Sequence, residues 1–168
     1  MDLIVETLDK SHLKSNFECG HPLLDNYIQK QAKQDVQRDL SACYVLVCNP
    51  DKTVMGYYTL SSNSIKRRDL PEDLAKKLPP SYDDLPTALL GRLAVSNACK
   101  GNGYGEYLLL NALNRCADIS ETLGTLAVIV DLIDEKAVSF YAAYGFVKLP
   151  GNGKMFITIK TIKNSKPV

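Results

Sequence analysis

Hydrophobic and polar positions alternate with two different periods along this chain, and the changes of period mark the expected elements. A period of two residues, or a short continuous apolar run, predicts strands at residues 2–8, 41–49, 53–62, 87–95 and 124–132. Apolar positions three and four residues apart predict helices at residues 21–39, 103–120 and 134–146. Residues 146–149 and 155–162 predict a closing strand hairpin.

The order of these elements predicts an α/β fold. Residues 41–62 form two β-rich runs around an Asn-Pro-Asp turn, which indicates an antiparallel hairpin. The later strands alternate with helices, which favours parallel pairing with helices packed on the sheet. Residues 66–87 contain four prolines and predict one short helix inside an irregular excursion, of the kind that often borders a binding site.

Length and composition fit one globular domain over residues 1–168. The chain is 45% hydrophobic and 23% charged, and no apolar run approaches the roughly 20 residues that span a bilayer. The first residues lack the basic-then-apolar pattern of a leader peptide, so we expect a cytoplasmic protein without membrane contact. The five cysteines include no CxxC pair, which argues against a disulfide framework or a zinc site, and we expect no metal.

Three glycines stand at alternate positions between an apolar strand and an amphipathic helix, at Gly101, Gly103 and Gly105. A glycine turn at a helix N-terminus exposes backbone N–H groups at the positive end of the helix dipole, which predicts an anion site. Glu106 and Tyr107 follow the last glycine, so the Lys and Ser/Thr of a triphosphate-binding P-loop are missing. The spacing and the mid-chain position also differ from those of a dinucleotide-binding fingerprint.

Residues 100–105, KGNGYG, resemble the pattern Q/R-x-x-G-x-G/A of the GNAT N-acetyltransferases, and FYAAYGF at residues 140–146 resembles the family's closing FYxxxGF element. The resemblance implies the GNAT fold, a central twisted sheet of mixed antiparallel and parallel strands with helices on both faces. It also implies that the loop amides hold the pyrophosphate of acetyl-CoA, while the preceding strand pairs with the pantetheine arm. The implied cofactor-binding residues are Leu93, Ala94, Val95, Lys100, Gly101, Asn102, Gly103, Tyr104, Gly105 and Glu106.

Tyr141 matches the position where this family places its general acid, although an aromatic residue there could also serve only to pack the helix on the sheet. The resemblance assigns the oxyanion contact to the backbone N–H of Leu93 or Val95. His12 and His21 are better interpreted as surface or capping residues than as a general base. An α-amine with a pKa of about 7.7–8.0 is already partly neutral, so such a substrate needs no strong base.

Four further segments resemble the GNAT toxins of type II toxin–antitoxin pairs: FECGHPLLDNYIQKQAKQD, GYYTLSSNSI, LPPSYDDLPTALLGRLAV and DEKAVSFYAAYGF. This resemblance implies that aminoacyl-tRNA is the substrate, acetylated on its α-amine to block translation, and that a ribbon-helix-helix antitoxin and a second copy of the chain are partners. The candidate RNA contacts are Lys66, Arg67, Arg68 and Arg92. For Arg92 a salt bridge to Asp83 or Asp84 is the structural alternative.

The net charge of +1 gives no global attraction to a polyanion, so RNA binding requires a local basic patch. Three functions therefore remain open from the sequence. The first is the aminoacyl-tRNA acetylating toxin, and the second is an N-acetyltransferase of a small amine or of a protein or peptide N-terminus. The third is a non-catalytic acyl-CoA-binding module, which the presence of Tyr141 disfavours.

Overall fold

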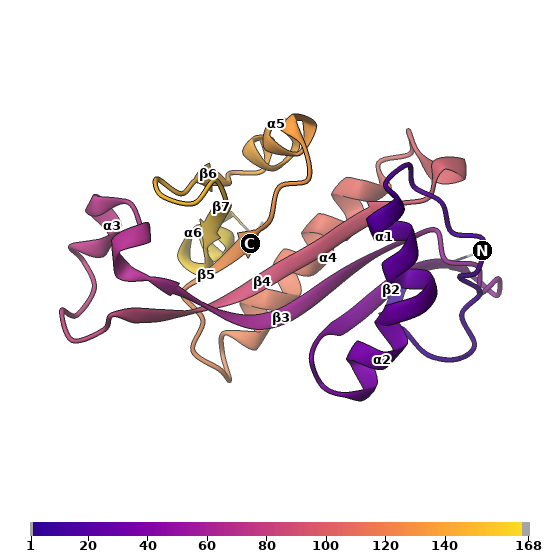
Figure 1. Cartoon of the computed structure of the whole chain (residues 1–168), viewed down its shortest axis with the longest axis horizontal. Coiled ribbons are helices and arrows are strands. Elements are labelled where there is room, and N and C mark those ends of the chain that lie inside the picture. Colours follow the sequence, from indigo (N-terminus) through magenta and orange to yellow (C-terminus); the bar gives the residue numbers. More distant parts are fainter. Residues whose placement is uncertain (1, 166–168) are drawn as a thin grey trace. The chain divides into compact units, whose positions relative to one another are not determined.

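Seven strands form the framework of residues 2–165, the part of the chain that this computed structural model describes. Their order in the sheet is β1-β2-β3-β4-β5-β7-β6 (Figure 1). The strands are β1 Asp2–Thr7, β2 Ala42–Asn49, β3 Gly56–Lys66, β4 Asp84–Val95, β5 Ala127–Val130, β6 Val147–Lys148 and β7 Met155–Thr158. The β4–β5 pair is parallel, and the β1–β2, β2–β3, β5–β7 and β6–β7 pairs are antiparallel. The predicted mixed α/β fold is confirmed.

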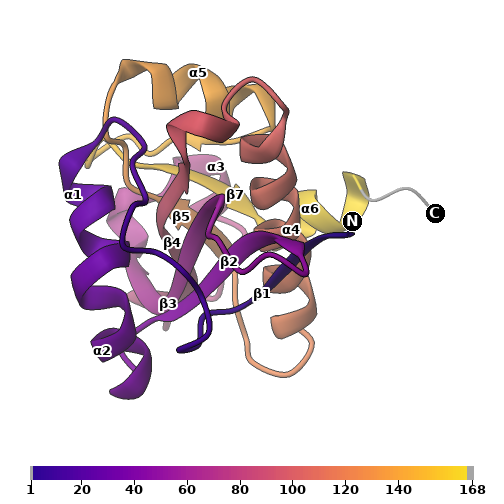
Figure 2. The same ribbon diagram turned by 90° about the vertical axis from the view of Figure 1, so that its right-hand side faces the viewer.

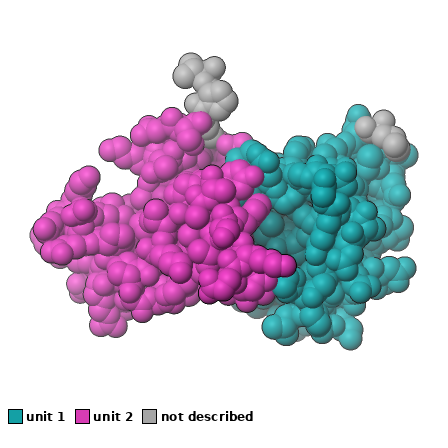
Figure 3. Space-filling model, turned by 90° about the horizontal axis from the view of Figure 1, so that it is seen from above, with its two compact units in different colours: residues 1–61, 91–112 teal, residues 62–90, 113–168 magenta. Residues whose placement is uncertain are grey.

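The chain divides into two compact units, which Figure 3 colours separately. Unit 1 comprises residues 1–61 and 91–112, and unit 2 comprises residues 62–90 and 113–168. Both β4 and helix α4, Tyr104–Ile119, contribute residues to each unit.

Unit 1 contains the predicted helix of residues 21–39, which the structure resolves into three consecutive segments. These are α1 Pro22–Asn26, a π-helical turn at Tyr27–Gln31, and α2 Ala32–Gln37. The helix begins with Pro22 at its first position, where the missing N–H costs no hydrogen bond. Its inward residues join the buried core of Leu24, Tyr27, Ile28, Ala32, Cys43, Val45, Val47 and Tyr57.

Two neighbouring tyrosines of β3 show that helices cover both faces of this strand within unit 1. The Tyr57 hydroxyl donates a hydrogen bond to the Leu24 carbonyl of α1, at 2.6 Å. The Tyr58 hydroxyl donates to the Asn111 side-chain oxygen of α4, at 2.7 Å. Because successive side chains of a strand point to opposite faces, α1 and α4 lie on opposite sides of β3, as Figure 2 also shows.

Unit 2 contains β5, β7 and β6 together with the first part of β4, whose residues Thr87–Leu90 pair with Ala127–Val130. Its helices are α3 Glu72–Ala75, α5 Glu135–Ala143 and α6 Ile159–Ser165. The buried residues of one core cluster are Ile65, Leu70, Leu85, Ala127, Ile129, Leu149 and Phe156. The single short helix predicted within residues 66–87 is α3, which follows a 3-10 turn at Arg67–Asp69.

The prediction of a strand over residues 155–162 is wrong in its second half. Strand β7 ends at Thr158, and residues 159–165 form α6. The Thr158 hydroxyl accepts a hydrogen bond from the Thr161 N–H at 3.1 Å, as an N-cap residue does. The buried Ile159 and Ile162 are three residues apart, a spacing that fits a helix as well as a strand end.

No helix among residues 2–165 is long and apolar enough to cross a membrane. Within the same range, no group of three or more His, Cys, Asp or Glu side chains is arranged to hold a metal ion.

Candidate acetyl-CoA site and the residues around it

The glycine loop joins the end of β4 to the first turn of α4, as the sequence predicts. Gly101 and Gly103 have φ angles of +85° and +79°, in the left-handed region that L side chains rarely adopt. A Cβ atom built on either glycine meets nothing within 4 Å, so open space rather than protein faces these positions. The glycines are therefore required by the backbone conformation, and they leave the loop accessible to a ligand.

Helix α4 begins directly after this loop and presents its N-terminus there. The first four N–H groups of an α-helix have no acceptor inside the helix, and they carry the positive end of its dipole. The Tyr107 N–H donates to the Gly103 carbonyl at 3.0 Å, which closes the first turn. The Asn102 side chain donates to the Cys99 carbonyl at 2.9 Å and fixes the turn from the other side. This open, donor-rich turn fits a pyrophosphate group.

The end of β4 has backbone groups that β5 does not use. Strand β5 ends at Val130, opposite Leu90, whereas β4 continues to Val95. Consecutive residues of a strand direct their backbone groups to opposite edges, and the Ala94 carbonyl and the Ser96 N–H, which donates to the Met55 carbonyl at 2.8 Å, are on the β3 side. The N–H and C=O groups of Leu93 and Val95 therefore face the other edge, which fits the extended amide chain of a pantetheine arm.

Gly56, at the start of β3, permits the close packing that holds this strand end in place. A Cβ atom on Gly56 would lie 2.9 Å from the Ala94 carbonyl oxygen and 2.8 Å from the Leu108 side chain of α4. Both distances are shorter than real Cβ contacts, so a larger residue would push β3 away from β4 or α4.

Lys100, predicted as a cofactor contact, has a structural partner. Its ammonium group donates to the Cys19 carbonyl at 2.6 Å, and the Asn97 N–H donates to the Glu18 carbonyl at 2.7 Å. Together these bonds fasten the segment before α1 to the start of the glycine loop. Lys100 is exposed. Its contact with the cofactor stays a prediction.

Tyr141 lies in α5, which begins with the Asp134 side chain accepting a hydrogen bond from the Ala137 N–H at 2.9 Å. Tyr141 is 7% exposed, and its ring contacts those of Phe140 and Phe146, each with ring centres 5.2 Å away. Burial, and secondarily the negative charge of Asp131, raises the pKa of the Tyr141 hydroxyl to about 12. The phenol therefore stays protonated at physiological pH, where it can donate a proton or a hydrogen bond but cannot act as a general base.

The predicted basic run of residues 66–68 is largely occupied by contacts within unit 2. The Lys66 ammonium pairs with the Asp84 carboxylate at 2.6 Å. The Arg67 guanidinium donates to three carbonyls of the proline-rich segment, those of Ala75 at 2.7 Å, Tyr82 at 2.8 Å, and Pro79. Arg68 is exposed and makes no hydrogen bond or ion pair within the described chain. Arg67 thus orders its own loop.

Arg92 lies on an aromatic face. Its guanidinium carbon is 3.5 Å from the centre of the Tyr27 ring, a cation–π contact within unit 1. The Tyr27 hydroxyl donates to the Asp35 carboxylate at 2.9 Å, and burial and that hydrogen bond raise the pKa of Tyr27 to about 12. Asp84, one of the two salt-bridge partners considered for Arg92, pairs with Lys66.

The two histidines are placed differently from one another. The His12 ring is buried, its Nδ1 accepts the Asp9 N–H at 3.0 Å, and its Nε2 lies 2.7 Å from a Glu6 carboxylate oxygen. Both ring nitrogens are thus engaged by neighbouring residues. His12 is thus a buried structural residue, and the prediction of a surface or capping position is wrong for it. His21 is the N-cap residue of α1, where its carbonyl accepts the Leu24 and Asp25 N–H groups.

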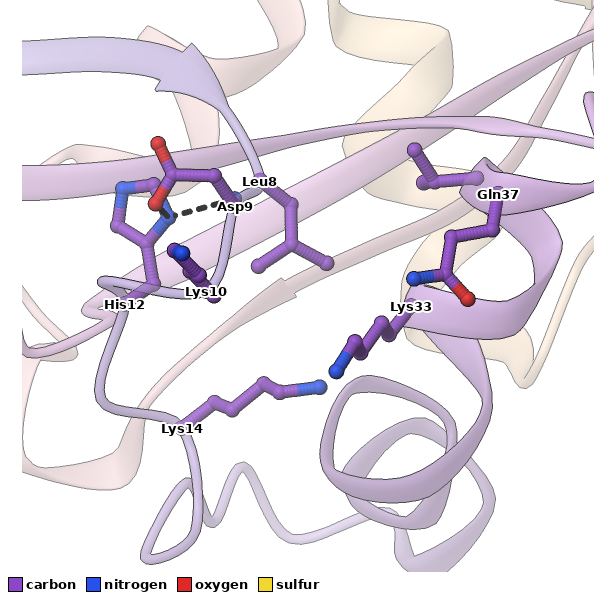
Figure 4. Close-up of a pocket in the computed structure, with 8 residues that line it drawn as sticks. Leu8, Asp9, Lys10, His12, Lys14, Lys33 and Gln37 are labelled. Carbon is purple, nitrogen blue, oxygen red and sulfur yellow. Dashed lines mark hydrogen bonds and ion pairs between the residues drawn. The ribbon is translucent and has the colours of Figure 1, made fainter.

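A pocket that no sequence motif indicated opens in unit 1, and Figure 4 shows it. It has a volume of about 550 Å³ and is lined by Leu8, Asp9, Lys10, His12, Lys14, Lys33, Val36 and Gln37. Its lysines are separated along the sequence, so no local charge run marked them.

Comparison with known proteins agrees with this geometry. The chain is 33% identical over 170 residues to "Probable toxin TacT" of Sinorhizobium fredii, which covers 96% of this chain and 93% of that protein. It is 34% identical over 132 residues to the "tRNA-acetylating toxin" of Mycobacterium tuberculosis, covering 79% of this chain and 76% of that one.

Two solved structures have the same fold over nearly their whole length. AtaT complexed with acetyl-methionyl-tRNAfMet has a TM-score of 0.90 and 31% identity, covering 97% of this chain and 98% of that one. A mutant AtaT toxin bound to the C-terminus of the antitoxin AtaR and acetyl-CoA has a TM-score of 0.81 and 26% identity, covering 98% of both chains. The family model described as "Acetyltransferase (GNAT) family" matches residues 6–146. This chain belongs to the GNAT acetyltransferase family.

Proposed function

We propose that this protein is an acetyl-CoA-dependent N-acetyltransferase that acts as a toxin by acetylating the α-amine of aminoacyl-tRNA and so blocks translation. The open glycine loop at the N-terminus of α4 is the observation that carries the acetyl-CoA half of this proposal. The acceptor half is supported by the likeness to toxins named for tRNA acetylation and by a structural neighbour solved with acetylated tRNA.

Acetyl-CoA supplies the activated acetyl group as a thioester, and this chain supplies its binding groups. We assign the pyrophosphate to the backbone N–H groups at Gly101, Asn102, Gly103 and the first turn of α4, which includes Tyr104, Gly105 and Glu106. Leu93 and Val95, on either side of Ala94, offer their backbone groups to the pantetheine amides. Lys100 holds the loop through the Cys19 carbonyl and keeps its positive charge beside it.

Acetyl transfer to an amine needs a donor for the developing oxyanion and a donor for the departing thiolate. We assign the first role to the backbone N–H of Leu93 or Val95 and the second to the Tyr141 hydroxyl. A phenol with a pKa of about 12 is a weaker acid than a thiol with a pKa of about 8.5. Tyr141 therefore acts mainly by donating a hydrogen bond to the thiolate, whose proton can come finally from the attacking amine.

The partners follow from the same proposal. An antitoxin of the ribbon-helix-helix class would neutralise the toxin, and a homodimer would be its working form.

The cytoplasm is the expected compartment, since aminoacyl-tRNA is used there. We also propose that residues 1–168 act as one acetyltransferase domain. Arg92 in unit 1 and Arg68 in unit 2 are the proposed contacts to RNA, and Lys66 and Arg67 add positive charge to the segment that contains Arg68.

Translation in a cell extract tests this function. Protein synthesis should stop only when the protein and acetyl-CoA are both added, and addition of the Tyr141→Phe variant should leave synthesis largely intact. Unimpaired synthesis, accompanied by acetylation of a small amine or a peptide N-terminus, would replace the toxin with the second acetyltransferase function.

A further inference from the structure

The pocket between the segment after β1 and helix α2 combines an apolar floor with unpaired positive charge. Leu8 and Val36 contribute the apolar surface, while the side chains of Lys14 and Lys33 extend toward one another across the opening (Figure 4). Its volume of about 550 Å³ falls within the range of roughly 300–1,000 Å³ that small-ligand sites occupy.

The two ammonium groups face each other without a carboxylate between them. Burial and the positive charge of Lys33 lower the pKa of Lys14, which places the two charges close together. The nearby carboxylates are engaged elsewhere: Asp9 accepts the Ser11 N–H at 2.8 Å, and Glu6 bonds His12 at 2.7 Å and Lys52 at 2.9 Å. Among the described residues, Lys14 and Lys33 form no ion pair. An anionic group between them would relieve their repulsion.

Burial raises the pKa of the Cys43 thiol to about 12, and the positive charges of Lys14 and Arg92 both act in the opposite direction. Both cations therefore add positive potential within unit 1. The basic run of residues 66–68, in contrast, has two of its three cations occupied within the protein.

We propose that this pocket receives one nucleotide of the RNA acceptor, with its phosphate between Lys14 and Lys33 and its ribose and base against Leu8 and Val36. This inference rests on the proposed function, and it identifies part of the surface by which the acceptor is held. An unstacked nucleotide at a single-stranded RNA end is the form that proteins take into such pockets. The amide of Gln37, at the pocket wall, offers a donor and an acceptor to a base edge.

Steady-state kinetics with aminoacyl-tRNA test the proposal on a Lys14→Gln/Lys33→Gln double variant. The KM for aminoacyl-tRNA should rise about tenfold or more, while kcat and the KM for acetyl-CoA stay within about twofold of the wild type. The slope of log affinity against log salt should become shallower by about one, because one phosphate contact is lost. A Lys14→Arg variant keeps the charge and should retain most of the affinity.

The matched control is Lys30→Gln/Lys160→Gln, which removes the same charge from exposed lysines outside the pocket. An equal KM and an equal salt slope for the two double variants would overturn the proposal while leaving the acetylation of aminoacyl-tRNA in place. The proposal would also be overturned if the pocket variant kept its KM and salt slope for aminoacyl-tRNA and differed from the wild type only in no longer being inhibited by an acidic peptide partner such as an antitoxin. A wild-type protein that does not acetylate aminoacyl-tRNA at all would remove both the function and this inference.

Discussion

The guanidinium of Arg92 rests on the ring of Tyr27, with 3.5 Å between the guanidinium carbon and the ring centre. Arg92 comes from the strand that leads into the glycine loop, and Tyr27 comes from the helical segment before β2. The Asp35 carboxylate holds the Tyr27 hydroxyl at 2.9 Å, so the aromatic platform is itself fixed. This arrangement orients a cation that has no hydrogen-bond partner among residues 2–165, so its N–H groups remain available to a substrate.

A pair of substitutions at Tyr27 separates the platform from its hydrogen bond. Tyr27→Phe keeps the ring beneath Arg92 and should leave the KM for aminoacyl-tRNA unchanged, while the lost hydrogen bond lowers the free energy of unfolding by about 1 kcal/mol. Tyr27→Leu removes the ring and should raise that KM about fivefold, because a cation–π contact contributes roughly 0.5–2 kcal/mol to holding Arg92. Urea unfolding and initial rates give both quantities. Identical KM values for the two variants would mean that Arg92 does not depend on the ring.

Glycine substitutions test the acetyl-CoA loop with an internal control. Gly101 and Gly153 have φ angles of +85° and +73°, and a Cβ on either meets no protein atom within 4 Å. Changing either to alanine should cost about 1 kcal/mol of stability through backbone strain alone. Only Gly101→Ala should also weaken acetyl-CoA binding, by about tenfold or more, since it adds a methyl group where the pyrophosphate is assigned. Calorimetric titration measures the affinity, and equal affinities in both variants would move the pyrophosphate away from this loop.

Tyr141→Phe should lower kcat at least about tenfold and leave the Kd of acetyl-CoA unchanged, because only the donor to the thiolate is lost. Since the raised pKa of about 12 keeps Tyr141 protonated, its loss should not alter the shape of the pH–rate profile below about pH 10. Any rise in rate near pH 8 should instead follow deprotonation of the substrate amine, in wild type and variant alike. A high-pH limb that disappears in Tyr141→Phe would show that the phenol titrates in the working range.

Arg67 is expected to order the proline-rich segment of unit 2, through the carbonyls of Ala75, Pro79 and Tyr82. Arg67→Ala should therefore speed tryptic cleavage after Lys76 and Lys77 by about tenfold, because hydrogen bonds to a charged group are lost. Arg68→Ala removes an adjacent exposed arginine and serves as the control, with little change expected. Limited proteolysis followed by mass spectrometry reports the sites, and equal cleavage rates would mean that the segment is ordered by other contacts.

The sequence predicted those features that have a local pattern. Alternation identified β1, the β-branched and aromatic run before the Asn-Pro-Asp turn identified β2, the helical period identified α4, and the glycine spacing identified the turn between β4 and α4. The terminal helix α6 was not predicted, because Thr158, Ile159 and Ile162 suit a strand and a capped helix equally. Tertiary packing decides between the two conformations.

The parts of the site that depend on tertiary contacts could not be predicted in the same way. A run of three basic residues gives no sign that Arg67 donates to carbonyls up to fifteen positions away, or that Lys66 is paired with Asp84. Lys14 and Lys33 are nineteen residues apart, and only the packing of α2 beside the segment after β1 brings their charges together. Arg92 was recognised from its motif, whereas its aromatic partner could be found only from the fold.

The proposed chemistry is tested most directly by incubating the purified protein with acetyl-CoA and charged tRNA, hydrolysing the aminoacyl ester, and measuring the mass of the released amino acid. We expect an amino acid that carries one acetyl group on its α-nitrogen, formed only when acetyl-CoA is present and largely lost in Tyr141→Phe. Release of unmodified amino acid from every charged tRNA, while the same preparation acetylates a small amine or a peptide N-terminus, would contradict the assignment of aminoacyl-tRNA as the substrate.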